Sequence, residues 1–182
     1  MTAQRYNEVL DFWFNELEPK QWWQKDEGLD SMIQKRFDAL HRQAKSGELF
    51  TWRDTAFGSL AEVIILDQFS RNIYRDTPEA FASDPMALAL AQFAISKGFE
   101  KELSDIQCSF LYMPFMHSES KLIHVEAVKL YEALGIKNNL DFEHKHKMII
   151  DRFGRYPHRN KILGRQSTEE ENEFLKQPNS AF

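Results

Sequence analysis

The stretch that decides the fold class of this chain is DTAFGSLAEVIILDQFSRNIY, residues 54–74. Its middle, residues 60–66, is apolar on nearly every side, a pattern typical of a helix that other helices surround. On a helical wheel that advances by about 100° per residue, Asp67 and Arg71 fall on the same stripe as Leu60. The stretch therefore predicts a central buried helix that carries two charged side chains, within pairing reach of each other, on its core-facing side.

Apolar residues spaced three and four apart continue on both sides of this helix. Capping residues, glycines and prolines mark the ends of these segments, and no segment shows the strict alternation of a half-buried strand. We therefore expect an all-α fold, an array of about eight antiparallel helices in a superhelical or bundle arrangement similar to tetratricopeptide repeats. The expected helices cover roughly residues 6–17, 29–44, 54–74, 84–97, 104–112, 118–134, 139–153 and 168–175.

Two serines predict where the fifth and sixth of these helices begin. Ser104 and Gln107 form a capping box, and the helix that they open is expected to end just before Pro114. Ser118 is expected to cap the following helix. This boundary places Glu119 in the first helical turn, where a carboxylate interacts favourably with the helix dipole.

The length and composition set broad limits on the kind of protein. A chain of 182 residues fits a single domain over residues 1–182, with a loose C-terminal tail from about residue 177. Hydrophobic residues make up 42% of the chain, which is enough for a sizeable core. The formal charge of −5 argues against nucleic-acid binding, which needs a broad basic surface. The lack of a signal peptide and of a long apolar run predicts a cytoplasmic protein that does not bind membranes. The oligomeric state stays open.

The cysteine and histidine residues do not form a recognisable metal site. Cys108 is the one cysteine, so an intramolecular disulfide and a cysteine-rich zinc site are excluded. His117 and His124 are seven residues apart, and no HExxH motif or phosphate-binding glycine loop occurs. His146 lies on an apolar helix face, where a core histidine is more common than a ligand. We therefore expect no metal and no cofactor.

The strongest local charge lies in residues 152–165, RFGRYPHRNKILGR. This stretch holds five arginine and lysine residues and no carboxylate, so the remainder of the chain carries a formal charge of −10. Pro157 and two glycines indicate a loop, and loops carry function more often than the packed core. His158, Arg159 and Asn160 have the donors for a cradle around phosphate or carboxylate. The structural alternative is that these arginines neutralise carboxylates inside the fold.

Four separated motifs follow one another in the chain: LDQFSRNIYR at 66–75, with Ala80, Phe81 and Asp84 after it; YMPFMHSE at 112–119; FGRYPHRN at 153–160; and LGR at 163–165 with Ser167 and Thr168. Together they closely resemble a bacterial family catalogued as domain of unknown function 924, DUF924. The resemblance covers nearly the whole chain. It implies an all-helical array similar to tetratricopeptide repeats, and it implies no activity or catalytic roles. At the position of Tyr156, this pattern has Phe as often as Tyr.

Three kinds of function follow from these observations. We favour a domain that binds an anionic small molecule or peptide group in a cleft lined by arginine, histidine and aspartate. The first alternative is an enzyme of hydrolase or lyase type that uses acid–base chemistry in the same cleft, and the second is a structural protein-interaction module. For Asp67 and Arg71, a structural ion pair is the alternative to a binding site. The expected ligand-binding residues are Asp67, Arg71, Asn72, Arg75, Arg155, Arg159, Asn160 and Arg165, and the catalytic candidates are His117, Glu119 and His158.

Overall fold

A computed structural model describes residues 2–178 and 180, with side chains from residue 5 onward. Within these residues the chain forms helices and no strand, so the all-α prediction is confirmed. The helices α3 and α4 are two ends of one continuous helix joined by a π-helical segment, and eight helices among the described residues match the expected number. The tetratricopeptide-repeat-like arrangement stays a prediction.

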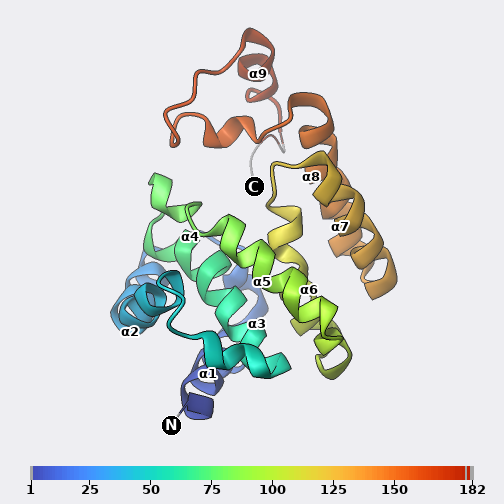
Figure 1. Cartoon of the computed structure of the whole chain (residues 1–182). Helices are drawn as coiled ribbons and strands as arrows, with labels where there is room; N and C mark the ends of the chain where they lie inside the picture. Colours follow the sequence, from blue (N-terminus) through green and yellow to red (C-terminus); the bar gives the residue numbers. More distant parts are fainter. Residues whose placement is uncertain (1, 179, 181–182) are drawn as a thin grey trace. The chain divides into compact units, whose positions relative to one another are not determined.

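The α-helices are α1 (Thr2–Asp11), α2 (Glu27–Lys45), α3 (Ala56–Ile64), α4 (Ser70–Ile73), α5 (Asp84–Ser96), α6 (Asp105–Met116), α7 (Lys121–Leu134), α8 (Lys137–Phe153) and α9 (Glu169–Phe174) (Figure 1). Two π-helical segments, Phe12–Glu16 and Ile65–Phe69, continue α1 and α3. Short 3₁₀ helices are formed by Pro19–Trp22, Phe50–Asp54, Pro78–Ala80, Phe99–Glu102 and Pro157–Arg159.

The chain divides into two compact units, a division that the sequence pattern does not predict. The N-terminal unit consists of Met1–Arg75 and Glu79–Pro114, and the C-terminal unit consists of Asp76–Pro78 and Phe115–Phe182. The boundary falls within α6, at the proline of that helix.

The N-terminal unit is built around α3, as the apolar middle of its sequence predicts. This helix packs against α1 and α5, while α4 packs against α2 (Figure 1). Leu60 and Ile64 are fully buried. Phe37 and Phe69 meet with ring centroids 4.9 Å apart, and further aromatic rings pack around them. Large aromatic side chains contribute much of the free energy gained on burial, so this cluster is a main source of the unit's stability.

The C-terminal unit begins with a helical hairpin. Helices α7 and α8 pack along each other and are joined through Gly135, which adopts the left-handed conformation with φ 76°. Its small apolar core consists of Ile149, Ile150 and Tyr156, against which Phe153 and Phe174 pack. Much of the remaining interior of this unit is polar, as described below.

Two predicted helix boundaries are wrong. Helix α6 does not end before Pro114 but continues through it to Met116. A proline inside a helix removes one backbone hydrogen bond, and the burial of every residue from 110 to 116 offsets this loss. Ser118 is not the cap of the next helix. Ser120 takes this role by accepting from the Ile123 N–H, so Glu119 lies in the connection before α7 and not in a helical turn.

The predicted loose tail from residue 177 falls partly outside the described residues, which omit 179, 181 and 182. Ser180 is buried, and its hydroxyl donates to the carbonyl of Leu175 at 3.1 Å.

Gly58 in α3 is expected to be the glycine least tolerant of a side chain. A Cβ atom there would lie 2.2 Å from the carbonyl oxygen of Trp52. We expect Gly58→Ala to lower the free energy of unfolding by about 2 kcal/mol, because this overlap outweighs the better helix propensity of alanine. Gly28→Ala in α2 is the matched control, since its Cβ would meet a side-chain oxygen of Asp26 at 3.1 Å. Urea unfolding that gives both variants equal stability would contradict the prediction.

Candidate functional site

The basic stretch of the C-terminal unit is held by a network of ion pairs. Arg155 forms two hydrogen bonds with Glu171, at 2.7 and 2.8 Å, and a third with the carbonyl of Gln166. Asn160 is buried and donates to Glu171 and Ser167. The side chain of Glu171 also accepts from the N–H of Thr168, which completes a capping box at the start of α9. Hydrogen bonds from Arg155, more than any other influence, lower the pKa of Glu171 to about 2.

Glu119 is a second carboxylate in the same network of ion pairs. Arg165 donates to both oxygens of this carboxylate, at 2.6 and 2.9 Å, and the backbone N–H of Tyr156 donates to it at 2.7 Å. Burial raises the pKa of Glu119, but the hydrogen bonds from Arg165 and Tyr156 outweigh it and hold this pKa below its usual value. A carboxylate in this state is a weaker base than a free one, which counts against Glu119 as the general base of an enzyme.

The predicted residues of the N-terminal unit also contact carboxylates. Arg71 donates to both oxygens of Asp84, at 2.9 and 3.0 Å, and to the backbone and side chain of Asp67. Asp67 is almost fully buried, so its position on the core-facing stripe is confirmed. Asn72 and Arg75 both donate to Asp30, a partner that the sequence analysis missed. Buried charges need such partners, and these contacts are what the structural alternative requires.

The ring of Tyr156 is the centre of a polar group that we call the Tyr156 cluster: Tyr156, His124, His146, His158 and Arg159. The ring is fully buried, and the Arg159 guanidinium carbon lies 4.5 Å from its centroid. The rings of His146, His158 and His124 lie 5.7, 5.5 and 6.3 Å from it. The Tyr156 hydroxyl donates to the carbonyl of Met116 at 2.6 Å, which ties the loop to the residue next to His117.

His146 is the buried histidine of the Tyr156 cluster that lies on the apolar face of α8. This histidine is buried and hydrogen-bonds to the carbonyl of Phe142, so its interpretation as a core residue is confirmed. Burial is the main cause that lowers the pKa of His146 to about 3, and the charges of His117 and Arg159 act in the same direction. Positive potential from these two side chains therefore reaches the same point in the unit.

A second pair in this interior, His124 with Glu143, was not predicted. Both residues are fully buried, and Nδ1 of His124 lies 2.7 Å from Oε1 of Glu143. Nε2 of His124 lies 2.8 Å from the carbonyl of Ser118, which accepts only, so Nε2 carries the hydrogen. Burial raises the pKa of Glu143, and its Oε2 has no hydrogen-bond partner. Both ring nitrogens of His124 are therefore held by hydrogen bonds inside the unit.

A serine and a histidine also meet in the N-terminal unit, but not in a catalytic arrangement. Nε2 of His41 lies 2.7 Å from the hydroxyl of Ser70, and both residues are fully buried. The Ser70 hydroxyl donates to the carbonyl of Leu66, so it accepts from His41 instead of giving up its proton to it. Burial lowers the pKa of His41 to about 4.

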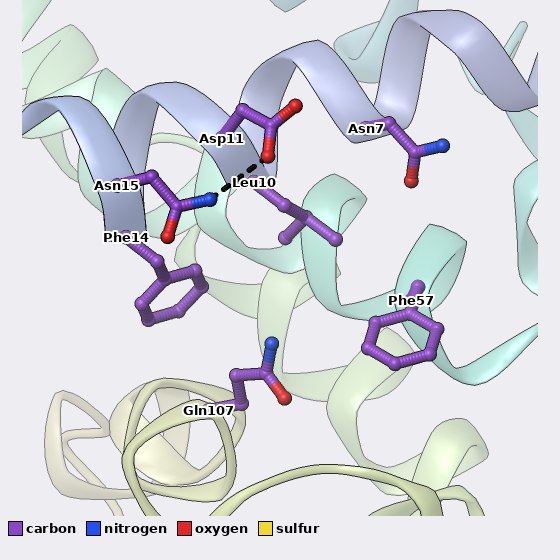
Figure 2. Close-up of a pocket in the computed structure, with 7 residues that line it drawn as sticks. All are labelled: Asn7, Leu10, Asp11, Phe14, Asn15, Phe57 and Gln107. Atoms are coloured by element: carbon purple, nitrogen blue, oxygen red, sulfur yellow. Dashed lines mark hydrogen bonds between the residues drawn. The ribbon is translucent and has the colours of Figure 1, made fainter.

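The described residues lack two features that would point to other kinds of function. Among residues 2–178 and 180, no group of three or more histidine, cysteine, aspartate or glutamate side chains is arranged to hold a metal ion. No helix in this part of the chain is long and apolar enough to span a membrane. A surface hollow of about 200 Å³ lies on the N-terminal unit (Figure 2), and none of the predicted site residues lines it.

Comparisons with known proteins place these features in a family context. A family model described as a bacterial protein of unknown function, DUF924, matches residues 9–179. The chain is also similar to a solved structure from Agrobacterium tumefaciens, described as the protein of unknown function ATU0120. The two share 37% sequence identity with a TM-score of 0.92, and the match covers 97% of this chain and 99% of that chain. The comparison with curated proteins found no match.

Proposed function

The chain belongs to the bacterial DUF924 family, whose description names no activity, and we propose from its own residues that it binds a small anionic group at the Tyr156 cluster. The proposed ligand is a phosphate or carboxylate, free or at the end of a small molecule or peptide. Its proposed contacts are Arg159, His158 and His117, all in the C-terminal unit.

The observation that carries the proposal is the position of Arg159. Its guanidinium stacks on the buried Tyr156 ring, and the whole residue is only 6% exposed. Stacking fixes the plane of the guanidinium, so little conformational entropy is lost when it binds a planar or tetrahedral oxyanion. The half-buried His158 and His117 supply donors that a ligand in solvent reaches.

The neighbouring carboxylates define the role of the other residues of the loop. Glu119 and Glu171 are the acidic groups of the loop network, and each is held by its own arginine, Arg165 and Arg155. Asn160, Arg155 and Arg165 therefore support the loop, while Arg159 and the two histidines are the proposed ligand contacts. The residues Asp67, Arg71, Asn72 and Arg75, expected at the site from sequence, have no part in the proposal.

Anion binding is expected to stabilise the protein against heat. At a concentration 100 times the Kd, inorganic phosphate would add about 2.7 kcal/mol to the free energy of unfolding. For a chain of this length that is a rise in Tm of roughly 5–10 °C. Differential scanning fluorimetry in phosphate, citrate and chloride at equal ionic strength measures this effect. Chloride is the reference for screening by salt.

His158→Gln and His117→Asn are expected to reduce the phosphate-dependent rise in Tm by more than half. Both residues are half-buried, so these variants should fold. Arg152→Gln is the matched control, because Arg152 lies in the same basic stretch but pairs with Glu170 at the surface. A response to phosphate that Arg152→Gln reduces as much as His158→Gln would show non-specific attraction. No rise of Tm with any anion would refute the proposal.

A further inference from the structure

The hollow on the N-terminal unit has walls from three helices (Figure 2). Asn7, Asp11 and Asn15 follow one another at intervals of four residues along α1 and its π-helical continuation, so they form one polar ridge. Gln107 of α6 lies opposite them, between the rings of Phe14 and Phe57 in the view of Figure 2. In Figure 2 the side chain of Leu10 points from α1 into the space above Gln107.

The polar groups of the hollow are nearly all carboxamides. Three of the lining residues are Asn7, Asn15 and Gln107, and each carboxamide offers both a donor and an acceptor. The one carboxylate, Asp11, accepts a hydrogen bond from Asn15 at 2.9 Å. The oxygen of Gln107 accepts from the N–H of Ser104, and its nitrogen points towards Leu10 and α1 in Figure 2.

This set of groups discriminates between ligand charges. Among the described side chains, no arginine, lysine or histidine lines the hollow, so they offer nothing to neutralise an anion. A small cation would meet one carboxylate, already hydrogen-bonded to Asn15, and several amide N–H donors that a cation cannot satisfy. A hydroxyl group both donates and accepts, so it can hydrogen-bond with either the nitrogen or the oxygen of each carboxamide.

The apolar part of the hollow sets the shape of the ligand. Phe14 and Phe57 present aromatic rings, and Phe57 is 39% exposed. An exposed ring beside hydrogen-bonding side chains suits a ligand with an apolar face and a polar edge. The volume of about 200 Å³ lies below the range usual for drug-sized ligands, which limits the occupant to a single small ring.

We propose that this hollow binds one ring of a neutral sugar or cyclic polyol, with hydroxyl groups on Asn7, Asp11 and Gln107 and a C–H face on Phe57. The site is separate from the Tyr156 cluster and takes an uncharged ligand, whereas the cluster takes an anion. A ligand with so few atoms binds weakly, with a Kd in the millimolar range.

Saturation-transfer NMR on the full chain tests this proposal with glucose, galactose and myo-inositol as probes. We expect saturation transfer to at least one of them, and a loss of about five-fold or more in Phe57→Ala and in Asn7→Leu. Phe50→Ala is the matched control, because Phe50 is a more exposed phenylalanine of the same unit, away from the hollow. This variant should bind as the parent does.

Asp11→Asn separates a polyol from a cation. It keeps an acceptor for Asn15 but removes the charge, so sugar binding should change by less than about three-fold while the binding of an organic cation would be lost. Ethylammonium, methylguanidinium and acetate are the charged probes. Saturation transfer to a charged probe and not to a sugar would overturn the proposal, as would sugar binding that Phe57→Ala leaves intact or the absence of binding to all probes.

Discussion

Glu171→Gln is expected to lower the free energy of unfolding by about 3 kcal/mol. The carboxylate is almost fully buried, and it accepts two hydrogen bonds from Arg155 and others from Thr168 and Asn160. Removing its charge leaves Arg155 without its ionic partner, and a broken buried ion pair of this kind costs more than an exposed one. Chemical denaturation at pH 7 measures the difference.

The pH dependence of stability gives an independent readout of the same carboxylate. Its pKa falls from an ordinary value of 4.5 to about 2 in the folded protein, so the unfolded chain takes up a proton first as the solution is acidified. The stabilisation is present above pH 4.5 and is lost as the pH falls through 2. Glu171→Gln should therefore lose less stability than the parent between pH 4.5 and 2.

Glu170→Gln is the control for both measurements. Glu170 is the neighbouring residue, and it pairs with Arg152 at an exposed position where both side chains are at least half accessible to solvent. Its replacement should change stability by less than about 1 kcal/mol. If Glu171→Gln and Glu170→Gln were equally stable, the buried network would have no special importance for the C-terminal unit.

Arg53→Met is expected to have a similar effect in the N-terminal unit, about 3–5 kcal/mol. Arg53 donates to both oxygens of Glu62, at 2.8 and 2.7 Å, and Glu62 is fully buried in α3. The variant leaves this carboxylate without its arginine in an apolar helix. Urea unfolding of the parent and the variant measures the cost.

The double variant Arg53→Met with Glu62→Leu distinguishes the loss of a contact from the cost of leaving a buried charge without its partner. Because apolar replacements of a whole buried pair are often tolerated, we expect the double variant to be more stable than Arg53→Met alone. Arg42→Met is the control, since Arg42 pairs with Asp38 on the exposed surface. A double variant less stable than Arg53→Met would contradict this account.

Local signals in the sequence predict most of the helices correctly. Ser104 with Gln107 forms the expected capping box, and Thr168 with Glu171 forms one where the last helix is expected to begin. Gly135 and Gly154 end their helices in the left-handed conformation. Each of these signals involves residues within four positions of one another, so the pattern alone contains the information.

The two wrong boundaries have causes outside the local sequence. Ser118 and Ser120 are equally good caps by residue type. The choice between them depends on Glu119, which pairs with Arg165, 46 residues away, and therefore lies outside the helix. Helix α6 continues through Pro114 because its surroundings bury it. Neither influence is visible in a helical wheel or a propensity scale.

The candidate site residues show the same difference between local signals, which the sequence contains, and distant partners, which it does not reveal. The buried position of Asp67 is evident from helical phase, because Asp67 lies on the same helix as the apolar stripe. The partners Asp30 for Arg75 and Glu143 for His124 come from other helices, so periodicity could not identify them. The sequence alone could have identified Glu62 as a residue that needs a partner, because it is a lone carboxylate in the apolar middle of its helix.

The π-helical segment Ile65–Phe69 sets the angular register of everything that follows it in the helix. A π-helical turn holds one residue more than an α-helical turn, and each α-helical residue rotates the chain by about 100°. If the same residues formed an α-helical turn, Arg71 and Arg75 would be rotated by about 100° and would lose their contacts with Asp84 and Asp30. Deletion of one residue from this segment would therefore give an α-helical turn and leave both arginine–aspartate contacts in register, whereas an insertion would turn both arginines away at once.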